Sequence, residues 1–184
     1  FRVLQNQKNE HAYRFERHPN QAFLFEENLG FKNRLYLIGG GHCALALSEL
    51  MSKLDFHLTL FDDRADLNTF AKNRFVHQKH RLDSYENIGE LIPSGNEVYV
   101  VVMTVGYRTD EAVIRQLLHK NFRYFGVLGS AAKMETLLGQ LRGEGVPEAQ
   151  LVRIRTPIGL KINSRTPEEI AVSVAGEIIG VKNA

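Results

Sequence analysis

Residues 34–44 read Arg34-Leu-Tyr-Leu-Ile-Gly-Gly-Gly-His-Cys-Ala44, an apolar run that enters a cluster of glycines and leaves it as a helix-like pattern. The spacing Gly39-x-Gly41-x-x-Ala44 matches the fingerprint of a dinucleotide-binding turn, in which alanine is permitted at the third position. Gly39 allows the tight turn from strand to helix, and Gly41 lacks the Cβ that would keep a phosphate away from the backbone N–H groups. The sequence therefore predicts a strand, a phosphate-binding glycine turn (with Gly40 at its centre) and a helix.

A second apolar run follows at the distance that such a turn requires. His57-Leu-Thr-Leu-Phe61 reads as the next parallel strand, and Asp62, Asp63 and Arg64 come directly after it. An acid at this place hydrogen-bonds a ribose 2′-OH in dinucleotide-binding domains, so we expect Asp62 to bind ribose and to favour NAD over NADP. Asp63 is either a helper of Asp62 or a partner of Arg64, and Arg64 leaves the choice between NAD and NADP open.

The rest of the chain alternates between strand and helix patterns. We expect strands near 34–38, 57–61, 75–77, 97–104, 123–130 and 151–154, and helices near 42–54, 108–120, 131–142 and 166–181. Helix 108–120 should turn Ala112, Val113, Leu117 and Leu118 inward. This alternation predicts the α/β class, as a Rossmann-like parallel sheet with helices on both faces.

Residues 1–33 differ from this domain at 34–184, and we interpret them as an N-terminal arm or the remnant of an upstream domain. The chain begins with Phe1 rather than Met, so we expect a segment to precede it. His11-Ala-Tyr-Arg-Phe-Glu-Arg17 alternates between aromatic and charged residues, which suits one edge strand. Such a strand could add to an exposed sheet edge and give a homodimer; a frayed remnant is the alternative.

Composition narrows the function classes. With 184 residues and 43% hydrophobic content, the chain can bury one proper core. The net charge of +2 gives no reason to expect nucleic acid, and no run of about eighteen apolar residues predicts a membrane span. No signal peptide is visible, and the single cysteine, Cys43, fits a reducing cytoplasm.

Further candidate residues follow the other strands of the predicted sheet. Thr104 ends one strand, and Gly129, Ser130 and Lys133 form a turn at a helix start, which is either a second anion site or a Ser130 cap beside a solvated lysine. Ligands bind at the carboxyl ends of such strands, so these residues should converge with the glycine turn.

Four other features have simpler structural explanations beside the functional ones. His42 and Lys133 are the candidate catalytic residues, and His42 is otherwise an ordinary first-turn residue. His77-x-x-His80 has metal-like spacing, but no acid or cysteine completes it, so we expect no metal site. Thr166-Pro-Glu-Glu169 reads as a capping box, with Glu168 free to face the site. Cys43 is either activated at the helix start or a small buried packing residue.

Six ordered motifs together resemble the carboxyl-terminal domain of the XdhC/CoxF family, which comprises maturation factors for xanthine dehydrogenase and carbon monoxide dehydrogenase. They are Leu35-Tyr-Leu-Ile-Gly-Gly-Gly-His42, Phe61-Asp-Asp-Arg64, Val101-Val-Met-Thr104, Tyr124-Phe-Gly-Val-Leu-Gly-Ser-Ala-Ala-Lys133, Pro157-Ile-Gly-Leu160 and Thr166-Pro-Glu-Glu-Ile-Ala-Val-Ser173. The resemblance implies a domain that binds molybdenum cofactor (molybdopterin) and helps deliver its sulfurated form to a molybdenum hydroxylase of the xanthine dehydrogenase type, with a cysteine desulfurase as a further partner.

The chain departs from the family in three places. The N-terminal domain with a cysteine motif is missing, Ala131 and Ala132 stand where relatives often have basic residues, and no His follows Thr104. The alternative function is an NAD(P)-dependent oxidoreductase, with His42, Lys133 or Tyr107 as the proton donor. A methyltransferase is less favoured because Ile38, and not an acid, precedes the glycine turn, and an empty turn with a purely structural role is the remaining alternative.

Overall fold

The computed structural model describes residues 13–17, 23–27 and 30–184. The chain divides into two compact units, residues 1–31 and residues 32–184. In the first unit, β1 (Tyr13–Arg17) and β2 (Phe23–Glu27) pair as an antiparallel hairpin that sets Phe15 opposite Phe25. The expected strand is therefore present with a second strand that the sequence pattern did not predict. The first residues of the expected strand, His11 and Ala12, lie outside the described residues.

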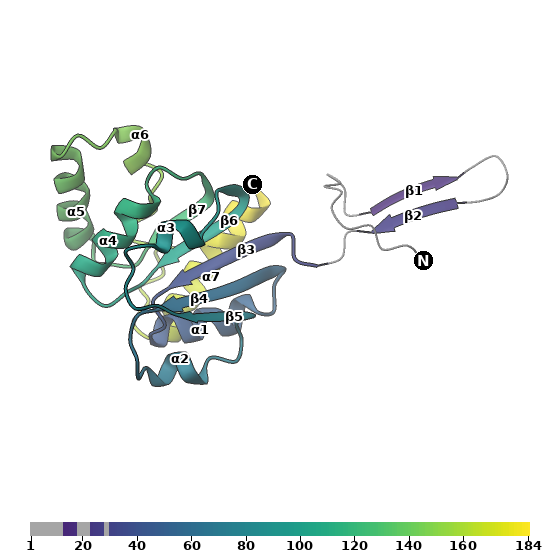
Figure 1. Ribbon diagram of the computed structural model, residues 1–184, viewed down its shortest axis with the longest axis horizontal. Coiled ribbons are helices and arrows are strands. Elements are labelled where there is room, and N and C mark those ends of the chain that lie inside the picture. The colour runs from purple at the N-terminus through teal and green to yellow at the C-terminus, as the bar shows by residue number, and fades with distance from the viewer. Residues whose placement is uncertain (1–12, 18–22, 28–29) are drawn as a thin grey trace. The chain divides into compact units, whose positions relative to one another are not determined.

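The second unit alternates strands and helices along the chain (Figure 1). The order is β3 (Asn33–Ile38), α1 (His42–Met51), β4 (Phe56–Asp62), α2 (Asn68–Lys72), β5 (Gln78–Arg81), α3 (Ile88–Leu91), β6 (Gly95–Val102), α4 (Tyr107–Leu117), β7 (Phe122–Val127), α5 (Ala131–Gly143), α6 (Glu148–Leu151) and α7 (Pro167–Asn183). Every strand of this unit runs parallel to its neighbours, in the spatial order β5-β4-β3-β6-β7. The Rossmann-like class is confirmed.

The central strand β3 determines where a ligand can approach. Its neighbours are β4 on one side and β6 on the other, so the chain order reverses next to β3. In parallel sheets the crevice at this reversal, outside the carboxyl ends of the strands, is the usual ligand site. The glycine turn follows β3 directly, at that crevice.

Helices cover both faces of the sheet, because alternate side chains of each strand point to opposite faces. Leu35 and Leu37 belong to a core with α1 and α7, whereas Tyr36 and Ile38 belong to a core with α3, α4 and α5. All four are buried. Among the described residues, no helix is long and apolar enough to cross a membrane.

Three expectations about single elements are wrong. The strand expected at 75–77 lies at β5 instead, since Phe75 and Val76 are only partly buried before it. The strand expected at 151–154 is absent; Pro147 starts the short helix α6, and Leu151 and Ile154 are buried one helical turn apart. Only Arg155 bridges the edge strand, opposite Gly126. In α4, Ala112 is exposed and Ile114 takes its place in the core.

Candidate cofactor-binding site

The glycine turn uses its first and third glycines for different reasons. Gly39 has a φ of +104°, and a Cβ there would overlap the backbone carbonyl of Met103, so the turn itself requires glycine at this position. Gly41 has a φ of −70° and a ψ of −170°, which any residue adopts, and a Cβ there would meet no atom within 4 Å. The fold does not need glycine at 41, and the space at the start of α1 is open.

Gly40 is held from both sides by polar side chains. Its N–H donates to Asp62 Oδ2 at 2.6 Å, and its carbonyl accepts from the Thr69 hydroxyl at 2.6 Å. A Cβ on Gly40 would approach Phe70 at 2.9 Å, so bulk is excluded here as well. Thr69 was not among the predicted site residues, because nothing in its local sequence marks it as a partner of a turn that lies 29 residues away.

Asp62 and Arg64 form an ion pair at the end of β4. The Arg64 guanidinium donates to both carboxylate oxygens, from Nε at 2.9 Å and from Nη2 at 2.6 Å, and the Arg64 backbone N–H donates at 2.9 Å. Burial raises the pKa of Asp62, but the hydrogen bonds from Arg64 and Gly40 outweigh burial and hold the pKa below its usual value. Asp62 is thus ionised and engaged by the chain itself, and Asp63 beside it is half-buried.

The first turn of α1 borders the glycine turn. His42 is exposed there, and Cys43 is half-buried. Burial, followed by the nearby charge of Glu168 on α7, raises the pKa of the Cys43 thiol. The raised pKa keeps Cys43 a thiol, which supports the packing interpretation of this residue, and it places Glu168 on the side of α7 that faces α1.

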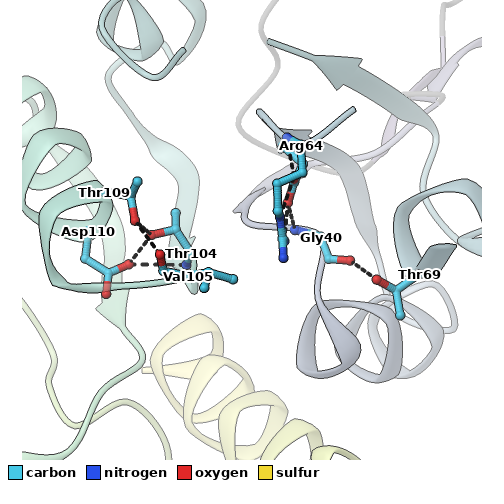
Figure 2. A network of polar contacts seen from close by, with 8 residues as sticks. Gly40, Arg64, Thr69, Thr104, Val105, Thr109 and Asp110 are labelled. Carbon is cyan, nitrogen blue, oxygen red and sulfur yellow. Dashed lines mark hydrogen bonds and ion pairs between the residues drawn. The ribbon is translucent and has the colours of Figure 1, made fainter. Parts of the chain in front are cut away.

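A second polar cluster follows β6, across the reversal point from Arg64 (Figure 2). Asp110, on the first turn of α4, accepts from the Thr104 backbone N–H at 3.2 Å and from the Thr104 hydroxyl at 2.5 Å. Lys133 of α5 donates to the other Asp110 oxygen at 3.2 Å, and the Thr109 hydroxyl lies 2.7 Å from that of Thr104. Asp110 and Thr109 were not among the predicted site residues.

The turn before α5 acts mainly as a helix cap. The Ser130 hydroxyl accepts from the Lys133 backbone N–H at 3.3 Å, and a Cβ on Gly129 would crowd the Met134 sulfur at 2.7 Å. The expected solvated state of Lys133 is wrong, since its ammonium group pairs with Asp110. Tyr107 donates to or accepts from Gln140 on α5 at 2.7 Å.

Comparison with known proteins follows from this geometry. The model of the XdhC Rossmann domain matches residues 35–178. This chain belongs to the XdhC family. It is 32% identical to the uncharacterized protein YqeB of Escherichia coli K12 over 84% of its own length and 28% of that protein. It is also 31% identical to a protein of Bacillus subtilis 168, named as a probable xanthine dehydrogenase component, over 85% of its length and 45% of that protein. The chain thus spans less than half of these relatives.

The fold of this XdhC domain also matches a crystal structure. A xanthine dehydrogenase from Bacillus halodurans superposes with a TM-score of 0.69 at 22% identity, over 91% of this chain and 48% of that one. The capping box of the shared motif, Thr166 with Glu169, is confirmed at the start of α7.

Other expected or visible features lie away from the glycine turn. His77 accepts a hydrogen bond from the Leu58 N–H through Nδ1, and His80 stacks on Phe61. Two open hollows of about 350 and 620 Å³ flank β7, lined in part by Arg123 and Arg155. They lie toward the amino ends of the strands and therefore do not belong to the glycine-turn site.

Proposed function

We propose that this XdhC domain holds a phosphate-bearing cofactor at its glycine turn and serves as an accessory module for the maturation of a molybdenum hydroxylase of the xanthine dehydrogenase type. The carrying observation is the open space at Gly41, in a turn whose other two glycines are fixed by Met103, Asp62 and Thr69. A turn built this firmly, with room for a phosphate at its third glycine, supports binding at the N–H groups of α1.

Molybdenum cofactor is the cofactor we favour, because it is a pterin phosphate and the chain belongs to the XdhC family. Gly39, Gly40, Gly41 and His42 would border its phosphate, with Thr104 and Lys133 across the crevice. When bound, such a cofactor supplies the molybdenum centre that the partner enzyme uses. The residues of this chain would bind and orient it, and the partner would be the molybdenum hydroxylase, with a cysteine desulfurase as the source of sulfur.

The second candidate is an NAD(P)-dependent oxidoreductase. It is favoured by Lys133, which the buried Asp110 fixes at the same edge of the sheet as the glycine turn. An ammonium group held in this way can donate a proton to a substrate bound beside a nicotinamide.

Binding tests separate these proposals. We expect molybdopterin to bind the protein in calorimetry, and Gly41→Val to weaken it at least about tenfold, since valine fills the open space without straining the backbone. Gly139→Val on α5, where a Cβ also meets nothing within 4 Å, is the matched control. An unchanged affinity in Gly41→Val would overturn the site. Activation of cofactor-free xanthine dehydrogenase by the loaded protein tests the accessory role, and turnover of NAD(P)H with an added acceptor would favour the oxidoreductase.

A further inference from the structure

The end of β4 presents a different group to a ligand than the sequence pattern predicts. The side chain of Asp62 is 0% exposed, whereas that of its partner Arg64 is 34% exposed. A ligand that lies along the glycine turn therefore reaches the guanidinium first.

The hydrogen bonds of Asp62 are also spent within the chain. Oδ2 accepts from Gly40 N–H and Arg64 Nη2, and Oδ1 accepts from the backbone N–H and Nε of Arg64. A ribose diol would have to displace Arg64 and then bury its own hydroxyls at that carboxylate. This exchange breaks charge-assisted bonds to make weaker ones.

Arg64, by contrast, has donor capacity left. A guanidinium carries five N–H groups in a planar fork, and Asp62 uses only the Nε and Nη2 edge. The Nη1 side remains for a second acceptor. The fork is also held in place, since both Asp62 and the Arg64 backbone fix it beside Gly40 (Figure 2).

We propose that Arg64, rather than Asp62, is the specificity-determining group at the end of β4, and that it selects ligands carrying a second anionic group at this point, of the ribose 2′-phosphate type, over ligands with a free ribose diol. The inference rests on the proposed phosphate site at the glycine turn. Arginine suits a phosphate because its fork makes two parallel hydrogen bonds to phosphate oxygens. Asp62 acts as a positioning residue that orients the fork.

Two small nucleotides test the inference without a complete cofactor. Adenosine 5′-monophosphate carries only the phosphate for the glycine turn, and adenosine 2′,5′-bisphosphate adds the second anion. We expect the protein to bind the bisphosphate at least about tenfold more tightly in calorimetry. Arg64→Gln should abolish this ratio and leave the affinity for the monophosphate within about twofold. Arg153→Gln, which removes an exposed arginine near the far edge strand β7, should preserve the ratio.

Arg64→Lys guards against a variant that does not fold, because it keeps the charge beside the buried Asp62 but loses the fork. We expect an intermediate ratio in this variant. A ratio at or below one in the parent protein, or a ratio that Arg64→Gln leaves unchanged, would overturn the inference. If the protein binds molybdopterin but neither nucleotide, the inference fails and the proposed glycine-turn site stands. If Gly41→Val leaves all binding unchanged, the proposed site itself fails.

Discussion

Replacing the Asp62 carboxylate by an amide of the same shape, in Asp62→Asn, should destabilise the fold more than any other change at the glycine turn that keeps side-chain volume. Asp62 is fully buried and accepts four hydrogen bonds, from Gly40 N–H and from three donors of Arg64. An amide keeps one acceptor oxygen and turns an NH₂ group toward the donors on the other side. At least two N–H groups then face a donor in place of an acceptor.

The magnitude follows from the partners that are left behind. The Gly40 N–H is buried, and an unsatisfied buried donor costs about 1–3 kcal/mol. Arg64 is partly exposed, so water replaces some of its lost bonds and lowers its share of the cost. We therefore expect the free energy of unfolding to fall by about 2–4 kcal/mol at pH 7.

The same carboxylate predicts how the loss depends on pH. Because the fold holds the pKa of Asp62 below its value in the unfolded chain, about 3.9, the ionised pair stabilises the protein fully above that pH. This contribution fades as the pH falls through the folded pKa. The difference between the parent protein and Asp62→Asn should thus be largest near neutrality and shrink in acid.

Urea unfolding of both proteins between pH 7 and pH 3 measures this difference, with sucrose added to keep the parent folded in acid. Asp66→Asn, in the exposed loop after β4, is the matched control and should change stability by less than about 0.5 kcal/mol. A difference for Asp62→Asn below about 0.5 kcal/mol at neutral pH, or one that stays constant into acid, would refute the reasoning.

Two further predictions concern the neighbouring parts of the site. Asp110→Ala should lower the free energy of unfolding by about 2–4 kcal/mol, because the Thr104 N–H and hydroxyl lose a buried acceptor, whereas Lys133→Met should cost less than about 1 kcal/mol, since Lys133 is partly exposed; a double-mutant cycle in urea checks that the two losses are coupled, and additive losses would contradict the pairing. Gly39→Ala should cost at least about 2 kcal/mol because of its positive φ and the Met103 carbonyl, and Gly41→Ala less than about 0.5 kcal/mol; equal melting temperatures for the two variants would argue against the described turn.

The order of strands and helices in residues 34–184 could be predicted because hydrophobic periodicity reports it directly. Val98 to Val102 form a continuous apolar run because β6 is buried on both faces, and α1 and α7 repeat their apolar residues at helical spacing. The segment around Leu151 misled this reasoning, since a short apolar run reads alike as a strand or as a helical turn. Pro147 was the overlooked sign of a helix start.

The side-chain partners at the site could not be predicted in the same way. The fingerprint located Asp62 correctly at the end of β4, but its pairing with Arg64, two residues on, depends on rotamers that no sequence pattern specifies. Asp110 escaped notice for a different reason. It belongs to the first turn of a helix, where an acid is usually explained by the helix dipole, and only the fold brings it to Thr104 and Lys133.

The two charged pairs at the carboxyl edge share an arrangement that bears on the kind of ligand bound there. In each pair the acid is buried and the base is partly exposed: Asp62 is 0% and Arg64 34% exposed, and Asp110 is 1% and Lys133 30% exposed. Each pair is neutral as a whole, yet it presents its positive end toward solvent. A ligand in the crevice lies closer to both cations than to either carboxylate, and the Coulomb energy falls with distance. The crevice therefore favours a ligand with more than one negative charge, and the glycine turn alone does not account for that preference.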